Sequence, residues 1–221
     1  MLFPSFTCVD NFLEDPDSVV ELSKKFDYIN QELSPGCRTK RLHELHFDFF
    51  NWINLKICTI FYPNRMKDIR FNADTYFQRT KKLEHDNWVH NDRVRFTAIL
   101  YLNKENTAGT SIFTGQDYRG HEGCFTDGYL KYKYFQNENH GLPEEELKKV
   151  KEAKDKNNKS FRKTFSVDGI YNRLIIFDGN AYHASNPMLT DHERLTLISF
   201  VRDIRLENGT IEFPIPTMRS I

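Results

Sequence analysis

The sequence lacks an excess of either charge and lacks a cysteine framework. Lys+Arg and Asp+Glu both number 31 among the 221 residues, so the net charge is zero. A nucleic-acid or other polyanionic partner is therefore not expected. The four cysteines have no Cys-x-x-Cys spacing, which predicts free, reduced thiols rather than a zinc site or disulfides. They are Cys8, Cys37, Cys58 and Cys124.

Long apolar runs, internal repeats and a secretory leader are missing as well. The longest apolar run is too short to span a bilayer. The N-terminus has neither the basic start nor the apolar core of a signal peptide. We therefore expect a cytoplasmic protein without membrane association. The length suits one domain over residues 1–221 with a sizeable core.

Helical periodicity is strongest in the N-terminal part of the chain. A short strand is expected within residues 2–12, and Asp15-Pro16 then opens a helix predicted over about 16–27. After a turn at 34–37, apolar residues at helical spacing predict a second helix over about 42–60. We expect this helical region, about 12–60, to support a sheet from outside.

From Ile69 onward short strands replace the helical pattern and predict a β core over about 69–204. A segment over about 116–163 interrupts this core and contains a lysine-rich helix that ends near Lys156. Because this helix is polar nearly all round, we expect an exposed insertion, either a lid or a solvated excursion. The chain is thus expected to be mainly β with supporting helices. Strands are predicted at 70–80, 94–103, 110–114, 161–167, 173–178, 194–203 and near 210–213.

Two His-x-Asp triplets stand out as candidate metal-binding sequences. His46 and Asp48 lie in a helical pattern, where residues two apart point to different faces. His90 and Asp92 precede a buried strand, and in an extended segment the same spacing places both side chains on one face. The second pair is therefore the candidate half of a metal site.

A second histidine, His183, would complete that site from a distant strand end. It is followed eleven residues later by Arg194, which heads an otherwise apolar strand and shares one strand face with Thr196. An arginine in that position is costly to bury unless it meets an anion. Two imidazoles and one carboxylate in a facial arrangement favour non-haem Fe(II), and a nearby guanidinium suits the distal carboxylate of a 2-oxo dicarboxylate.

Five short segments carry a family resemblance. They are His90-Asn-Asp92, Phe96–Asn103, Gly109-Thr-Ser-Ile-Phe, His183 and Arg194-x-Thr196. Together they resemble the Fe(II)/2-oxoglutarate-dependent dioxygenases, most closely the prolyl-hydroxylase-like branch. The resemblance covers roughly residues 70–115 and 165–204. It implies a double-stranded β-helix (jelly roll, cupin-like) with N-terminal helices packed outside.

The resemblance also implies roles for individual residues. His90, Asp92 and His183 would ligate Fe(II), and Arg194 would pair with the C5 carboxylate of 2-oxoglutarate. Tyr101 would hydrogen-bond the same carboxylate, and Thr196 is a further candidate for that contact. The implied reaction uses O2, converts 2-oxoglutarate to succinate and CO2, and hydroxylates a C–H bond.

The substrate and two other functional classes stay open. Peptidyl proline, a free amino acid and another small metabolite are all candidates, because the long insertion departs from compact prolyl hydroxylases. One alternative is a cupin-like metalloenzyme that does not use 2-oxoglutarate, in which Arg194 would be an ordinary salt-bridged residue. The other is a non-catalytic jelly-roll binding module with incidental histidines. The sequence does not indicate an oligomeric state.

Overall fold

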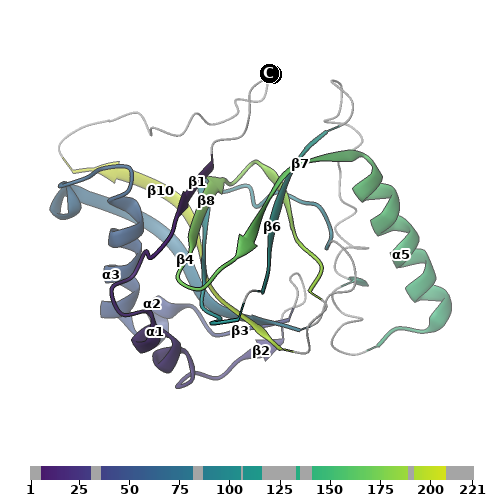
Figure 1. Cartoon of the computed structure of the whole chain (residues 1–221), viewed down its shortest axis with the longest axis horizontal. Helices are drawn as coiled ribbons and strands as arrows, with labels where there is room; N and C mark the ends of the chain where they lie inside the picture. The colour runs from purple at the N-terminus through teal and green to yellow at the C-terminus, as the bar shows by residue number, and fades with distance from the viewer. Residues whose placement is uncertain are drawn as a thin grey trace.

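The protein folds around two facing antiparallel sheets, with helices outside them. The computed structural model describes residues 6–30, 36–81, 87–105, 107–115, 133–134, 141–188 and 192–207. Figure 1 shows α1, α2 and α3 gathered on one side of the sheets and α5 on the other side. The double-stranded β-helix expected from the sequence is confirmed in this mainly β arrangement.

The larger sheet has seven strands and carries Tyr101, Arg194 and Thr196. Its longest strands are β10 and β4, which pair with each other, and the two-residue strands β3 and β2 extend it at one edge. Every pairing within it is antiparallel. The strands, in spatial order, are β1 (Phe6–Val9), β8 (Leu174–Asp178), β5 (Phe96–Tyr101), β10 (Arg194–Leu206), β4 (Ile69–Thr80), β3 (Cys37–Arg38) and β2 (Ile29–Asn30).

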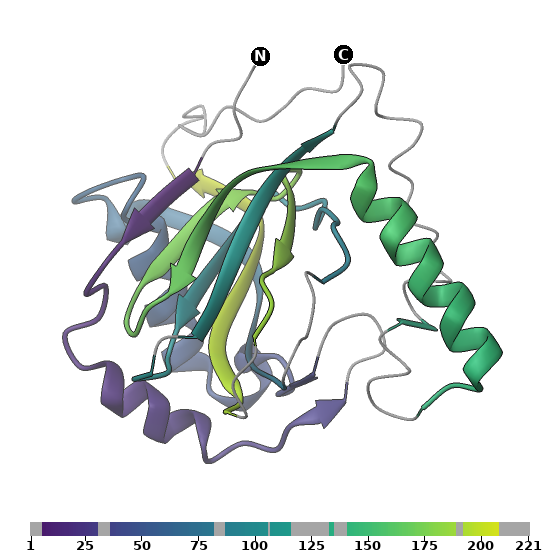
Figure 2. The same cartoon turned by 45° about the vertical axis from the view of Figure 1, so that its right-hand side comes forward.

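The smaller sheet has three strands and faces part of the larger one. Figure 2 shows it lying in front of the larger sheet. Tyr101, Ile175 and Phe177 of the larger sheet pack against Ile112 of the smaller one in an apolar cluster between the two. The strands, in spatial order, are β7 (Phe161–Gly169), β6 (Thr107–Gly115) and β9 (Tyr182–Ser185). The sequence pattern did not predict β9, which is only four residues long.

The N-terminal helices cover the outer face of the larger sheet, as expected. The main hydrophobic core lies between them and that face, where Leu42, Ile53 and Ile57 meet Phe77 and Leu197. The predicted helix over 16–27 ends earlier, and the one over 42–60 is divided. The helices are α1 (Pro16–Ser23), α2 (Leu42–Leu45) and α3 (Phe47–Cys58), followed by the 3-10 turn η1 (Met66–Asp68).

The division between α2 and α3 falls at His46. This residue is extended, with φ −156°, and its Nδ1 accepts a hydrogen bond from the amide of Phe49 at 3.3 Å. A side chain that accepts from the third helical amide caps the helix. His46 therefore has a local structural role as the cap of α3.

Helix α5 (Glu144–Lys159) is polar, but it is not wholly solvated as expected. Val150 is fully buried, and Lys154 and Asn157 are nearly so, which gives the helix one buried edge at helical spacing. The remaining faces carry the predicted charges, including the Glu145–Lys149 pair with Nζ and Oε1 2.9 Å apart. The expectation of an exposed insertion is wrong for that edge.

Several sequence predictions fall partly outside the described residues. The strand predicted near 210–213 and most of the segment 116–140 lie there, so they stay predictions, as does the lid interpretation of 116–163. Within the described part, Cys8, Cys37 and Cys58 are free thiols, as expected; Cys124 is outside it. None of the described helices combines the length and apolarity that a membrane span requires.

Candidate metal centre

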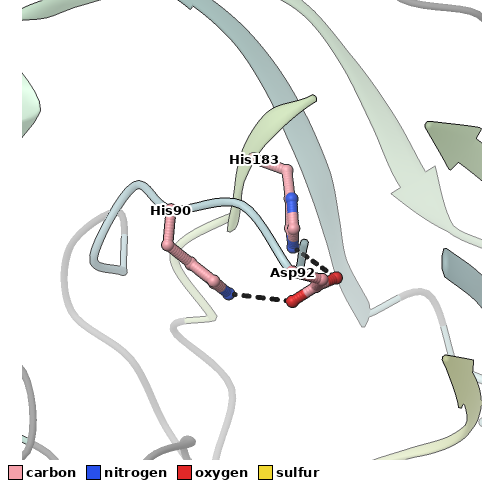
Figure 3. A group of neighbouring side chains, drawn as sticks. All are labelled: His90, Asp92 and His183. Atoms are coloured by element: carbon pink, nitrogen blue, oxygen red, sulfur yellow. Dashed lines mark ion pairs between the residues drawn. The ribbon is translucent and has the colours of Figure 1, made fainter. Parts of the chain in front are cut away.

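His90, Asp92 and His183 converge on one point, as the sequence predicted. Each offers one ligand atom, and these atoms lie within 4.8 Å of one another. Nε2 of His90 is 3.6 Å from Oδ1 of Asp92, and Nε2 of His183 is 3.4 Å from Oδ2 of the same carboxylate. Figure 3 shows both rings and the carboxylate pointing toward one another.

Backbone pairing brings the two histidines together across 93 residues of sequence. The amide of His90 donates to the carbonyl of His183 at 3.0 Å, and the amide of His183 donates back at 2.8 Å. Residues that exchange both hydrogen bonds in an antiparallel pair project their side chains from the same face. The segment before β5 thus lies beside β9 and delivers both imidazoles to one side.

Hydrogen bonds at Nδ1 orient both imidazole rings. Nδ1 of His90 is 2.8 Å from the carbonyl oxygen of Trp88, and Nδ1 of His183 is 2.9 Å from that of Ala181. A carbonyl can only accept, so in both rings Nδ1 carries a proton, and in the neutral tautomer that has this proton Nε2 is the acceptor nitrogen. This is the orientation in which protein imidazoles bind metals through Nε2.

Asp92 is held from two sides. The hydroxyl of Thr97 on β5 donates to its Oδ2 at 2.5 Å, and its backbone amide donates to the carbonyl of Gly179 at 2.8 Å. A Cβ on Gly179 would lie 2.2 Å from the carbonyl oxygen of Val94, so only glycine permits this close approach. Arg93, with φ 53°, then turns the chain into β5.

Helix α5 fixes the backbone just before His90. Oδ1 of Asn158 accepts from the amide of Val89 at 3.0 Å, and its Nδ2 donates to the carbonyl of Asn87 at 3.0 Å. Asn157 donates from Nδ2 to the carbonyl of Val89, also at 3.0 Å. Two side chains at the end of one helix therefore bind the backbone of residues 87–89 in the way that a neighbouring strand would.

The donor set fits a divalent ion with open coordination positions. Metal–ligand bonds of about 2.1 Å at right angles place neighbouring donor atoms about 3 Å apart. The observed separations of 3.4 and 3.6 Å are close to that value and too long for good hydrogen bonds. Two neutral imidazoles and a carboxylate are the ligands expected of a mononuclear non-haem iron site.

Arg194 lies buried between the two sheets, where its hydrogen bonds go to backbone carbonyls and a hydroxyl. Its Nη1 donates to the carbonyl oxygens of Ala108 and Gly109 at 3.1 and 3.2 Å, and its Nη2 donates to the hydroxyl of Ser185 at 2.9 Å. Among the described residues no carboxylate forms an ion pair with it, and its Nε has no hydrogen-bond partner. Burial lowers the pKa of the guanidinium.

Thr196 and Tyr101 lie on the same face of the sheet as Arg194. They are register partners on β10 and β5, and both side chains are fully buried. The hydroxyl of Thr196 has no hydrogen-bond partner in the described part of the chain. The hydroxyl of Tyr101 is 2.8 Å from that of Thr110 across the sheets. Burial raises the pKa of Tyr101, and the charge of Arg194 opposes this.

The six residues predicted for the site therefore form two adjoining groups. The three metal-ligand candidates meet beside Phe177, whose ring centroid is 4.6 Å from that of His183. The three anion-binding candidates share one sheet face. Sequence reasoning missed the residues that position both groups, because their contacts depend on how the strands and α5 pack and have no spacing signal of their own. These are Thr97, Ser185, Asn157 and Asn158.

Solved structures share this fold at low sequence identity. HygX from Streptomyces hygroscopicus, solved with nickel, 2-oxoglutarate and hygromycin B bound, is 11% identical with a TM-score of 0.52, over 89% of this chain and 82% of that one. The non-heme alpha-ketoglutarate-dependent epimerase SnoN from nogalamycin biosynthesis is 12% identical with a TM-score of 0.54, over 99% and 87%. A Trichoplax adhaerens prolyl hydroxylase is 11% identical with a TM-score of 0.52, over 90% and 83%.

These likenesses establish the fold of the 2-oxoglutarate–Fe(II) oxygenases. No curated protein matches the sequence. A family of unknown function, DUF6445, matches residues 5–197, which is most of the chain. The protein therefore belongs to the DUF6445 family, within the architecture of the 2-oxoglutarate oxygenases.

Proposed function

We propose that the protein is an Fe(II)- and 2-oxoglutarate-dependent oxygenase that hydroxylates a C–H bond of its substrate. One observation carries this proposal. A cluster of three metal donors lies in the same interior as a buried arginine that has no carboxylate partner among the described residues. The donors account for a metal, and the arginine accounts for a cosubstrate with a distal carboxylate.

His90, Asp92 and His183 would hold the iron. Their Nδ1 protons and the Thr97 hydroxyl fix the donor atoms before any ion binds, so little reorganisation is needed on binding. When bound, Fe(II) with 2-oxoglutarate supplies dioxygen activation: one oxygen atom enters the substrate C–H bond, and the other enters succinate as CO2 leaves.

Arg194 would bind the C5 carboxylate of 2-oxoglutarate. Its free Nε and the free hydroxyl of Thr196 offer two donors on one sheet face. Tyr101, directly opposite Thr196, would contribute a third. The apolar cluster of Ile112, Ile175 and Phe177 beside them would keep water from the reacting centre.

The alternatives fit these contacts less well. A cupin-like metalloenzyme without 2-oxoglutarate would leave Arg194 as an ordinary salt-bridged residue, but no described carboxylate pairs with it. A non-catalytic jelly-roll module would not require two imidazoles with both Nδ1 protons engaged and both Nε2 atoms aimed at one carboxylate. The first proposal accounts for both features.

The substrate class is not implied by the similar structures. A prolyl hydroxylase, an epimerase and an oxygenase-fold protein with bound hygromycin B have nearly equal TM-scores. The prolyl-hydroxylase-like branch is therefore retained as one proposal for the lineage, with peptidyl proline, an amino acid or a small metabolite as substrate. A cytoplasmic location is retained as a proposal in the same way.

The test is anaerobic binding of Fe(II) followed by 2-oxoglutarate. Chelation of the iron by the 2-oxo acid is expected to produce a weak visible charge-transfer band. We expect His183→Ala to abolish the band and His46→Ala, in the other His-x-Asp triplet, to retain it. Both variants should be shown to be folded by circular dichroism. A folded wild-type protein that gives no band would refute the proposal.

A further inference from the structure

A second arginine, Arg38, faces the metal side of the larger sheet. It is the register partner of Gln78 on β4, which pairs with Thr196 on β10, which in turn pairs with Tyr101 on β5. Register partners in antiparallel strands project from the same face. Arg38 therefore shares the interior face with Thr196 and Tyr101, and lies two strands away from Thr196, on β3.

The guanidinium of Arg38 lies against the rings of Tyr76 and Phe200. Its Cζ lies 5.5 Å from the ring centroid of Tyr76 and 5.2 Å from that of Phe200. Phe200 is the register partner of Thr97, whose hydroxyl holds the Asp92 carboxylate. Burial lowers the pKa of Arg38, and the Asp92 charge acts in the opposite direction, as expected of groups that share one space.

Arg38 is held in place by a neutral side chain and two rings, without an ion pair to any described residue. Its Nε donates to Oε1 of Gln78 at 2.6 Å, and the two aromatic rings support the planar group. No described carboxylate lies within ion-pair distance of it. Half-buried guanidinium groups normally find an anion, because losing hydration is costly. The orientation of Arg38 is therefore fixed, while its two Nη groups remain available for a ligand.

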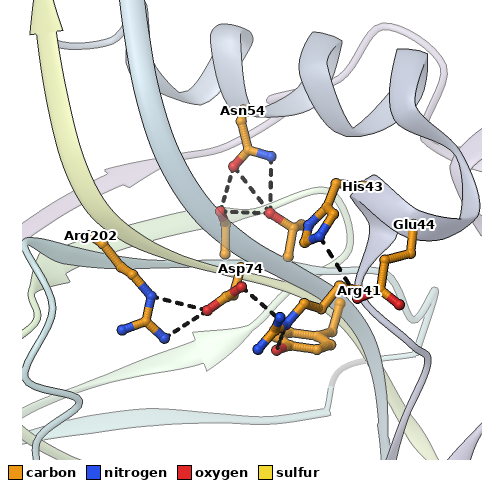
Figure 4. Close-up of polar contacts among 9 residues, drawn as sticks. Arg41, His43, Glu44, Asn54, Asp74 and Arg202 are labelled. Atoms are coloured by element: carbon orange, nitrogen blue, oxygen red, sulfur yellow. Dashed lines mark hydrogen bonds and ion pairs between the residues drawn. The ribbon is translucent and has the colours of Figure 1, made fainter.

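The neighbouring arginines differ from Arg38 in this respect. Arg41 and Arg202 both pair with Asp74, with N–O distances of 3.2 and 2.7 Å. Figure 4 shows Asp74 between these two side chains, on the side of the sheet away from Asn54. Arg41 and Arg202 thus share the Asp74 carboxylate, whereas Arg38 forms no ion pair with a described residue.

The Arg38 and Arg194 positions are too far apart to bind one carboxylate. Arg38 is two strands away from Thr196, which corresponds to about 10 Å at the usual strand spacing. Its guanidinium extends along the sheet toward Phe200, whereas Arg194 lies beyond Thr196 in the other direction along β10. With 2-oxoglutarate bound at Arg194, Arg38 would remain free for another molecule.

We propose that Arg38 binds an anionic group of the substrate, a carboxylate or a phosphoryl group, and so determines which C–H bond lies at the metal. This inference rests on the proposed oxygenase function and adds a substrate class to it. The Tyr76 and Phe200 rings would contact the apolar part of the substrate next to its anionic group. Substrates would then be anions, and neutral analogues would bind poorly.

Calorimetry on protein loaded anaerobically with Fe(II) and 2-oxoglutarate tests this site. With the Arg194 site occupied by cosubstrate, inorganic phosphate and acetate serve as probes of the second anion site, and their relative affinities distinguish phosphoryl from carboxylate recognition. We expect Arg38→Met to weaken the preferred probe at least about tenfold. Arg38→Lys should restore part of the affinity, because it keeps the charge but loses the planar fork.

The matched control is Arg202→Met, which removes an exposed charge from the same part of the sheet and should change probe affinity by no more than about twofold. All variants should keep the charge-transfer band, which separates this inference from the proposed function. Failure of wild-type loaded protein to bind either probe would overturn the inference, as would equal binding by Arg38→Met. Loss of the band in Arg38→Met would reassign the residue to the cosubstrate site.

Discussion

Two groups of polar side chains on opposite faces of β10 use their hydrogen bonds differently. Ser199 faces the helices, where Asn54 and Thr75 engage its hydroxyl, and Asn54 also donates to the carbonyl of Phe50 at 2.8 Å. Three residues earlier, Thr196 faces the interior, and its hydroxyl has no partner among the described residues. Figure 4 shows Asn54 above the sheet in the satisfied group.

The difference separates polar groups that satisfy one another within the fold from those that leave a buried atom unpaired among the described residues. Buried polar atoms that satisfy one another rigidify a core, whereas leftover buried donors are costly unless something binds them. Arg194 and Thr196 belong to the second kind because both leave a buried atom unpaired. The Tyr62 hydroxyl is another unpaired atom, and nothing in the structure explains it.

The strongest test of the comparison is Arg194→Met. Truncating one partner of a buried charge-assisted pair costs about 2–5 kcal/mol, so 2-oxoglutarate affinity should fall by about 100-fold. Stability of the ligand-free protein should change little, because an unpaired buried charge is removed together with its hydrogen bonds. Titration of the charge-transfer band and thermal denaturation measure the two effects. Unchanged cosubstrate affinity would show that Arg194 only joins the two sheets.

For Asn54→Leu we expect a loss of stability without a loss of ligand binding, the opposite of Arg194→Met. The change leaves the hydroxyls of Thr75 and Ser199 without their shared partner and should lower the free energy of unfolding by about 2–4 kcal/mol. Because this cluster lies on the helix side of the sheet, Fe(II) and 2-oxoglutarate affinities should stay at the wild-type level. Urea denaturation gives the first quantity. A loss of cosubstrate binding in folded protein would contradict the division between the two faces.

The smallest effects come from the two hydroxyls themselves. Ser199→Ala should destabilise the protein by about 1 kcal/mol without altering ligand binding. Thr196→Val, which keeps the shape, should leave stability unchanged or slightly higher and weaken 2-oxoglutarate about five- to tenfold. Denaturation and cosubstrate titration of both variants should show a loss of stability in Ser199→Ala and a loss of 2-oxoglutarate affinity in Thr196→Val. If both variants lost stability and affinity to the same extent, the distinction between the two faces of β10 would be wrong.

The sequence was sufficient to predict that His90, Asp92 and His183 meet, and insufficient to predict the residues that position them. His90 and Asp92 precede a buried strand and His183 lies near the end of another, so local spacing and strand periodicity identify them. Arg38 and Gln78 are 40 residues apart and meet only through the β3–β4 pairing. A two-residue strand carries no periodic signal, so no pattern in the sequence indicated this contact.

The contacts between helix α5 and residues 87–89 could not be predicted from the sequence for a related reason. Asparagines at the end of a lysine-rich helix are typical of solvated ends, and Asn158 meets Val89 across 69 residues. The hydrophobic pattern also could not reveal the buried edge of α5, because two of its three buried residues, Lys154 and Asn157, are polar and only Val150 is apolar. Tertiary hydrogen bonds of this kind depend on how the segments are placed, which a single sequence does not fix.

The hydrogen bonds from Asn157 and Asn158 to residues 87–89 make α5 a support for the His90 imidazole of the candidate metal centre. His183 belongs to a strand with neighbours of its own, whereas His90 depends on a helix that is otherwise charged and hydrated. Under the proposed function, a tag, truncation or crosslink that displaced this helix should therefore weaken Fe(II) binding before it affects the rest of the fold. Helix α5 and the candidate metal centre are, in that sense, one structural unit.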